Sequence, residues 1–365
     1  MKKILSVALA LCMILALGAT ALAADDAPAV AMITDYGDIT DQSFNQTTYE
    51  ACKAFADANK LDFQYYKPAS DSDEDRITSI EKAIDDGFTV IVMPGYAFGP
   101  AIQEVAPEYD DITFIALDVS EGDIGDLAKD VPANLYCAVY QEELCGYMAG
   151  YAAVKLGYTK LGFLGGMAVP AVVRYGYGFV QGCDAAAAEL GLKDVEVKYA
   201  YGNQFYGDSD ITAYMDTWYS AGTEVVFACG GGIFTSAGEA AAKVGGKVIG
   251  VDVDQAATID GLYGEGITVT SAMKGLAATV ESALSAILDG SFKGGKVDTL
   301  GLVSDVPAEN FVQIAGSTQF TDDFSEEDYA ALVAAMNAGD VTVSNDIAAE
   351  PAVKAISVDY QGNIK

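Results

Sequence analysis

Short apolar runs alternate with amphipathic segments along most of this chain. The runs at residues 30–34 and 112–117 have the length of buried strands, and each ends at a polar position. Between them, Tyr49, Cys52 and Phe55 recur at helical spacing. Such alternation of strands and helices is typical of an α/β protein built on mostly parallel sheets.

The pattern begins again after the run at residues 134–140. No low-complexity linker separates the two series, and 365 residues exceed what one hydrophobic core usually holds, so we expect two lobes joined by short strand crossings. Ser43 and Gln46 have the spacing of a capping box for the first helix. The expected strands are 30–34, 61–66, 88–93, 112–117, 134–140, 160–164, 195–201, 224–228, 247–251, 267–270 and 310–314. The expected helices are 44–59, 77–86, one near Ala101, 142–156, 175–190, 211–221, 236–244, 273–288 and 326–337.

Residues 1–23 have the features of a secretory signal peptide. Two lysines precede an apolar run, and the segment ends in an Ala-Leu-Ala cleavage pattern. Cys12 lies inside the run after the bulky Leu11, whereas a lipidation signal requires a small residue there. We therefore expect a secreted, extracytoplasmic chain that starts at Ala24, in the periplasm or at the outer face of the cell membrane, without direct membrane insertion.

The charge balance excludes several classes of partner. The chain has 53 acidic residues against 20 lysines and arginines, and its net charge is −33. Such a chain repels nucleic acid and anionic membrane surfaces. The hydrophobic content of 51% argues equally against disorder. The composition is that of an acidic globular protein.

Cysteine and histidine usage narrows the chemistry. No histidine is present, which removes the usual general base and the commonest metal ligand, so we expect no enzymatic activity, no metal and no cofactor. An odd number of cysteines remains after the signal, without any C-x-x-C pair, so neither a disulfide framework nor a zinc site is indicated. Buried free thiols are expected, with a Cys137–Cys145 bridge as the alternative. The five residues are Cys52, Cys137, Cys145, Cys183 and Cys229.

Candidate ligand-binding residues follow the expected strands. Asp35, Asp118 and Asp252 each come directly after or near the end of an apolar run, and the glycines 230–232 follow another. In open parallel sheets, ligands bind outside the carboxyl ends of the strands. Ionised carboxylates accept hydrogen bonds from vicinal hydroxyls, and glycines let backbone N–H groups approach closely. This combination suits a neutral, hydroxyl-rich ligand.

The start of the first helix adds a second kind of contact. Asp35, Asp41 and Asn45 suit the polar edge of a nucleobase, and Phe44 beside them can stack on its face. Lys274, just after the run at 267–270, can donate to a ligand oxygen or neutralise the carboxylates.

Two motifs that could indicate another function give no support for one in this sequence. No P-loop sequence is present. Asp71-x-Asp73-x-Asp75 has the spacing of calcium ligands, but Arg76 occupies the position where the calcium loop requires glycine. A solvated helix start explains this acidic run.

The sequence resembles a known family, the basic membrane proteins or PnrA-like nucleoside-binding proteins. The resemblance extends over nearly the whole chain after the signal, with the motifs in the same order. It rests on residues 34–35, 41–46, 165–167 with Pro170, 226–231, 248–255 and 270–274.

The resemblance implies a type I periplasmic-binding-protein fold that supplies an ABC importer with purine or related nucleosides. The partners would be a small-molecule nucleoside and the permease subunits, with no nucleic acid, and the protein would be a monomer. We expect residues 24–136 with about 255–308 in lobe 1, and 137–254 with about 309–365 in lobe 2, linked by hinge crossovers.

The resemblance also implies roles for individual residues. The base would be bound by Asp35 or Asp41 and by Asn45, with Phe44 as one stacking face and Phe227 or Phe234 as the other. The ribose would be bound by Asp118, Gly230, Asp252 and Lys274.

Three alternatives remain open at this point. The same fold could bind a monosaccharide or another small polar solute, for instance with Trp218 stacked on a pyranose. The aspartates could hold calcium in a nucleoside hydrolase. The chain could also be a sensory module that reports ligand occupancy to a membrane kinase.

Overall fold

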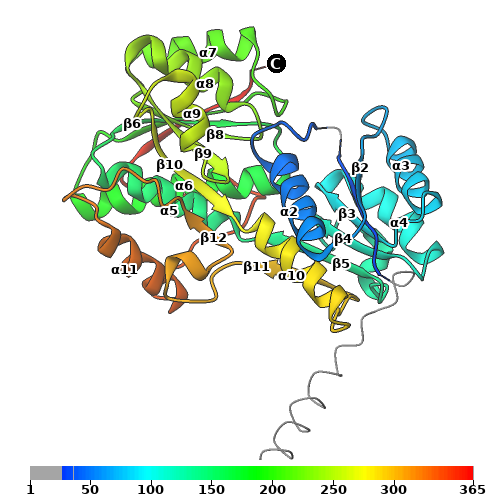
Figure 1. The fold of residues 1–365 in the computed structure, drawn as a ribbon. Helices are drawn as coiled ribbons and strands as arrows, with labels where there is room; N and C mark the ends of the chain where they lie inside the picture. The colour runs from blue at the N-terminus through cyan, green and yellow to red at the C-terminus, as the bar shows by residue number, and fades with distance from the viewer. Residues whose placement is uncertain (1–26, 36, 365) are drawn as a thin grey trace, which may run out of the picture.

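A computed structural model of the chain describes residues 27–35 and 37–364. The signal peptide expected at residues 1–23 lies outside these residues. The described part forms two lobes, each built on its own β-sheet, as Figure 1 shows. Within the described ranges, no helix combines the length and the apolar character needed to cross a membrane.

The first lobe has a six-stranded sheet in the order β11-β5-β4-β3-β1-β2, and every neighbouring pair is parallel. Helices α3 and α4 cover one face, and α2 and α10 cover the other. The strands are β1 (Val30–Ile33), β2 (Phe63–Tyr66), β3 (Val90–Pro94), β4 (Thr113–Leu117), β5 (Leu135–Tyr140) and β11 (Lys296–Leu300). The helices are α2 (Phe44–Asn59), α3 (Asp73–Asp85), α4 (Gly99–Glu108) and α10 (Leu276–Leu288).

The second lobe has a seven-stranded sheet in the order β12-β10-β9-β8-β6-β7-β13, in which only the β10–β12 pair is antiparallel. Helices α5 and α6 pack on one face, and α7, α8 and α9 on the other. The strands are β6 (Lys160–Gly165), β7 (Glu196–Tyr201), β8 (Val225–Cys229), β9 (Lys247–Asp252), β10 (Thr268–Lys274), β12 (Val312–Ile314) and β13 (Ser357–Asn363). The helices are α5 (Glu142–Lys155), α6 (Pro170–Leu190), α7 (Ser209–Ser220), α8 (Phe234–Val244), α9 (Ala256–Tyr263) and α11 (Glu326–Asn337).

Within the described residues, the chain crosses between the lobes three times. It passes from β5 to α5 through Gln141, from β10 to α10 through Gly275, and from β11 towards β12. The crossings lie side by side, because Gln141 N donates to Leu300 O at 2.9 Å and Gly275 N donates to Phe311 O at 2.7 Å. The two-lobed α/β fold with hinge crossovers is therefore confirmed.

Helix α9 and strand β10 lie with the second sheet, although we expected residues 255–308 in lobe 1. Helix α10 and strand β11, from the same range, do lie with the first sheet. The physical reason is that β10 pairs with β9 as far as Met273 and with β12 as far as Lys274. The same pairing explains why α10 begins at Leu276 and not at residue 273. Residues 137–140 lie in β5 of the first sheet, although we expected lobe 2 to begin at residue 137.

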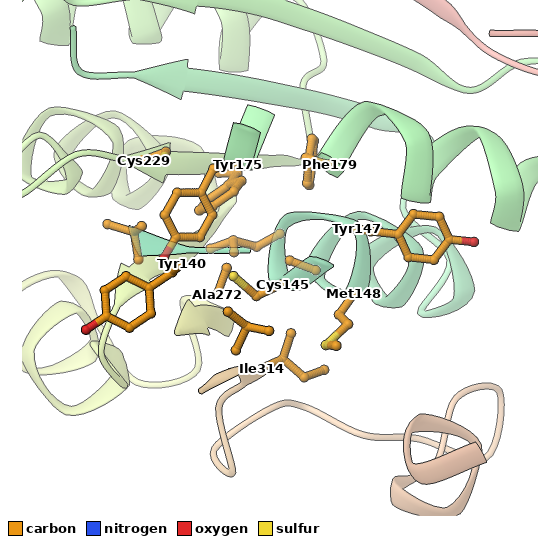
Figure 2. Packing of buried hydrophobic residues seen from close by; sticks show 14 of the residues in the cluster. Tyr140, Cys145, Tyr147, Met148, Tyr175, Phe179, Cys229, Ala272 and Ile314 are labelled. Carbon is orange, nitrogen blue, oxygen red and sulfur yellow. The ribbon is translucent and has the colours of Figure 1, made fainter. Parts of the chain in front are cut away.

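The core explains the state of the cysteines. All five are free and buried, which confirms that expectation. Cys137 and Cys145 do not form a bridge, because their side chains belong to separate core clusters. Cys145 lies with Met148, Tyr175 and Cys229 in one buried cluster, as Figure 2 shows.

Candidate functional site

A cavity of about 510 Å³ opens between the two lobes. Its size is typical of a site for a small organic molecule. The loops that line it follow β1, β3 and β4 in the first lobe and β6, β7, β8 and β9 in the second, so it lies at the carboxyl ends of both sheets. The residues singled out from the sequence that line this cavity are Asp35, Asp41, Phe44, Asn45, Asp118, Gly230, Phe234, Asp252 and Lys274.

Asp41 caps the helix that carries Phe44 and Asn45. Its carboxylate accepts from the backbone N–H groups of Ser43, Asn45 and Gln46 at 2.9–3.1 Å. The capping box expected from Ser43 is wrong, because the Ser43 hydroxyl makes no cap bond and donates to Asp252 Oδ2 at 2.6 Å. Burial raises the pKa of Asp41, against the lowering effect of these backbone donors. Asp41 therefore fixes the start of α2 within the cavity wall.

Asn45 presents a hydrogen-bond acceptor in this wall. Its Nδ2 donates to Asp41 Oδ2 at 3.2 Å, which fixes the orientation of the amide. Its Oδ1 is buried and has no hydrogen-bond partner among the described residues. A buried unpaired acceptor is costly unless a donor reaches it. The arrangement suits a ligand with an N–H group at this position.

Asp118 and Asp252 occupy equivalent positions in the two lobes, at the carboxyl ends of β4 and β9. Both adopt the left-handed backbone conformation, with φ of 57° and 65°. Outside glycine this conformation costs free energy and clusters at functional sites. The turns direct both carboxylates into the cavity, and Asp118 Oδ1 is buried without a partner among the described residues.

Lys274 connects these carboxylates across the gap. Its Nζ lies 2.6 Å from Asp118 Oδ2 and 3.5 Å from Asp252 Oδ1, and its side chain is only 4% exposed. A third carboxylate, Glu142, lies 3.9 Å away. Burial lowers the pKa of Lys274, but Asp118, Asp252 and Glu142 outweigh burial and raise it above its usual value. Lys274 therefore stays protonated and offsets part of the negative charge at the centre of the site.

Glu142 and Arg174 complete this charge network, and sequence reasoning missed both. Arg174 Nε donates to Glu142 Oε2 at 2.6 Å, and the Glu142 side chain is fully buried. Burial raises the pKa of Glu142, while Arg174 and Lys274 oppose the rise. Glu142 lies two residues after the end of β5, so the strand-end rule used for Asp118 could have found it. Arg174 lies inside α6, where no sequence signal marks it.

The aromatic residues of the cavity come from both lobes. The Phe44 ring lies 4.7 Å from Lys274 Nζ, and the rings of Tyr140 and Tyr175 lie 5.6 and 5.7 Å from it. Figure 2 shows Tyr140 and Tyr175 within the buried core cluster, and Tyr175 also lines the cavity. Lys274 thus lies among aromatic faces as well as carboxylates, and such contacts hold a cation in place.

Phe227 does not line the cavity, so this candidate for the second stacking aromatic is wrong. It is fully buried and packs against Phe163, Tyr175 and Phe179, because its position in β8 directs it into the core. Phe234 lines the cavity but is only 1% exposed.

Phe205, which sequence reasoning missed, lines the cavity from the second lobe and is half-buried. Gly230 has φ of 152°, and a Cβ there would lie 2.9 Å from the Phe205 ring and 3.0 Å from Gly166. Only glycine leaves room for this ring. Phe205 follows the end of β7, so the strand-end rule also applies to it.

Trp218 is remote from the cavity. It is 2% exposed in the core of the second lobe, and its indole N–H donates to Gln361 Oε1 at 3.0 Å. A sugar stacked on this ring, one of the open alternatives, is therefore excluded. The acidic run at 71–75 is also accounted for, because Asp71 and Asp73 form ion pairs with the buried guanidinium of Arg76.

The geometry is that of a two-lobed binding protein, and comparison with known proteins identifies the family. The family model described as "ABC transporter substrate-binding protein PnrA-like" matches residues 29–319. This chain belongs to the PnrA-like family of ABC transporter substrate-binding proteins. The resemblance inferred from its motifs is confirmed.

Relatives of this PnrA-like protein include curated bacterial proteins. It is 28% identical over 290 residues to the ABC transporter nucleoside-binding protein BmpA of Lactococcus lactis, covering 74% of this chain and 78% of the relative. It is 30% identical over 329 residues to the CD4+ T-cell-stimulating antigen of Listeria monocytogenes, covering 82% and 88%.

Solved structures share the fold. A solute-binding protein of an ABC transporter system from Conexibacter woesei matches with a TM-score of 0.67 at 23% identity, over 87% of this chain and 99% of that one. A counterpart from Aeropyrum pernix has the same TM-score at 20% identity, over 88% of each chain.

We expect Glu143 to make the stability of this PnrA-like protein depend on pH. Burial raises its pKa from the ordinary 4.5 to about 7, and Glu142 adds to the rise. A proton is then held in the folded state but lost in the unfolded state, so stability falls as pH rises from about 4.5 to about 7. We expect Glu143→Gln to remove this fall and to be more stable than wild type at pH 8 by on the order of 1–3 kcal/mol.

Urea unfolding at pH 4.5, 6 and 8 measures this effect. The exposed Glu327→Gln is the matched control, and its stability should follow that of wild type at each pH. Parallel pH profiles for Glu143→Gln and wild type would contradict the assignment.

Proposed function

We propose that this protein binds a nucleoside, with a purine nucleoside as the preferred class, in the cavity between its lobes. It then presents the nucleoside to the permease subunits of an ABC importer outside the cytoplasmic membrane. One observation carries the proposal: aromatic rings, an amide acceptor and strand-end carboxylates from both lobes line a single cavity. The name of the Lactococcus relative supports the same ligand class.

The chemistry of the lining divides the ligand into two parts. Phe44 and Phe205 offer flat apolar faces from opposite lobes for a base, and the free Oδ1 of Asn45 offers an acceptor for an N–H at its edge. Asp118 and Asp252 offer acceptors for the vicinal hydroxyls of ribose. A free base would leave these carboxylates without donors, and free ribose would leave the aromatic rings unused.

Charge supports a neutral ligand. Carboxylates outnumber cationic groups in the lining, and Lys274 and Arg174 already have carboxylate partners. A phosphate group would meet these carboxylates, and like charges at close range repel. Nucleotides are therefore expected to bind far more weakly than nucleosides.

Calorimetric titration with inosine, guanosine, adenosine, cytidine, hypoxanthine, ribose, glucose and inosine monophosphate tests the proposal. We expect one site per chain, with a Kd of micromolar or below for at least one purine nucleoside. We also expect binding at least about a hundredfold weaker for its free base, for ribose and for the monophosphate, since each loses several charged or stacking contacts. Tighter binding of glucose than of every nucleoside would refute the proposal.

A further inference from the structure

The two lobes also touch outside the part of the cavity that holds the carboxylates. The loop between β1 and α2 of the first lobe meets the segment that leads from β9 into α9 of the second. Gln255 Nε2 donates to Gln42 O at 3.0 Å. The Thr258 hydroxyl donates to Gln42 Oε1 at 3.2 Å. Two hydrogen bonds from the second lobe thus converge on one residue of the first.

Gln255 is held in place within the second lobe. It is 1% exposed, its Oε1 accepts from Val251 N at 2.9 Å, and its backbone N–H donates to Ser271 Oγ at 3.1 Å. With Oε1 occupied in this way, the amide has one orientation, and its N–H donor faces the other lobe.

Gln42 is held in place in the same way within the first lobe. Its backbone is left-handed, with φ of 57°. Its backbone N–H and its side-chain amide both donate to Gln46 Oε1, at 3.0 and 2.8 Å. Both halves of the contact are thus fixed before the lobes meet, so little side-chain entropy is lost when they do.

We propose that Gln42, Gln255 and Thr258 form an interlobe latch that stabilises the closed arrangement of the lobes independently of the ligand. Gln255 and Thr258 do not line the cavity. Their hydrogen bonds to Gln42 exist only when the lobes are together, so they favour closure with or without ligand. The proposal deepens the proposed function, because Gln42 also lines the cavity and so joins the latch to the site whose affinity the latch sets.

The latch has a defined expected effect on binding. If only the closed state binds the ligand, the apparent Kd rises in proportion as the fraction of closed molecules falls. Each neutral hydrogen bond accounts for roughly a two- to tenfold change in the closed population. Loss of both bonds should therefore raise the Kd of the bound nucleoside roughly 5- to 50-fold and increase its dissociation rate.

Two variants separate the latch from local structure. Gln255→Glu keeps an oxygen for Val251 N but replaces the donor that faces Gln42 O. Thr258→Val removes the hydroxyl and keeps the shape of the side chain. Gln64→Glu at an exposed position of β2 and Thr217→Val at an exposed position of α7 are matched controls for charge and for hydroxyl loss.

Small-angle X-ray scattering of the ligand-free protein tests closure directly, without reliance on any nucleoside. We expect compact wild type and compact controls, a larger radius of gyration for the Gln255→Glu/Thr258→Val double variant, and a smaller shift in the same direction for Thr258→Val alone. Addition of a bound nucleoside should restore the compact form. Far-ultraviolet circular dichroism confirms that each variant is folded.

The latch would be overturned if the folded Thr258→Val variant, the double variant and wild type all have the same radius of gyration without ligand. If ligand-free wild type has as large a radius of gyration as the double variant, the latch is overturned as well. Failure of every nucleoside to bind would instead refute the proposed function, while the ligand-free comparison would still decide on the latch.

Discussion

Replacement of Lys274 by methionine is expected to abolish nucleoside binding and to lower the free energy of unfolding at pH 8 by about 3–5 kcal/mol. Lys274 Nζ lies within 4 Å of carboxylate oxygens of Asp118, Asp252 and Glu142. Methionine fills a similar volume, so the loss comes from charge and not from a cavity. Burial of several negative groups without their cation costs far more than an exposed ion pair contributes.

Urea unfolding and calorimetry at pH 8 and pH 5 measure the Lys274→Met effect. The loss of stability should be smaller at pH 5, because Glu142, whose pKa is raised by burial, can then take up a proton. Lys243→Met on α8 is the control, since Lys243 is half exposed and pairs with Asp216 at the surface. It should change stability by about 1 kcal/mol or less. Equal effects of the two variants would contradict the charge network.

Asp252→Ala is expected to weaken nucleoside binding about ten- to a hundredfold while the protein stays folded. The substitution removes an acceptor for a ligand hydroxyl and the hydrogen bond from Ser43 Oγ, which crosses between the lobes. It also removes one of the carboxylates beside Lys274. Asp252→Asn keeps the shape and the tolerance for the left-handed backbone, so it isolates the loss of charge.

Asp254→Ala is the matched control for Asp252. Asp254 has the same charge two residues away, but it is exposed and accepts from Ser317 Oγ instead of facing the cavity. Calorimetry should give wild-type affinity for Asp254→Ala. An unchanged Kd for Asp252→Ala with every nucleoside that binds would refute the role of this carboxylate.

The fold could be predicted because strand and helix patterns are local. The helix at 44–59 and the helix at 326–337 have the predicted bounds, since each has an apolar face and clear ends. The lobe to which β10 belongs could not be predicted in this way, because it depends on the pairing of β10 with β9 and β12. Strand β13 was missed for the same reason, as its short polar sequence is a strand only beside β7.

The site could be predicted where residues follow the ends of buried strands. This rule found Asp118 and Asp252, which are distant in sequence and meet at Lys274. The resemblance offered Phe227 as one stacking candidate, but the direction of a strand side chain depends on the register of the sheet, and Phe227 is buried in the core. Arg174 was missed because its contact with Glu142 arises from the packing of α6 on α5.

The helix cap at Ser43 shows a second limit of local rules. The spacing of Ser43 and Gln46 fits a capping box, yet Asp41 takes over the cap. The Ser43 hydroxyl is then available to Asp252 in the other lobe, which no local pattern can indicate. The departure from the local rule thus occurs at the functional site, where such departures are expected.

A crystal structure of the protein grown with the tightest-binding purine nucleoside tests the central claim most directly. The account predicts one nucleoside in the interlobe cavity, with its base between Phe44 and Phe205 and an N–H within hydrogen-bond distance of Asn45 Oδ1. It predicts the ribose hydroxyls within hydrogen-bond distance of Asp118 and Asp252. A nucleoside bound outside this cavity, or a base in contact with neither aromatic ring, would contradict the account.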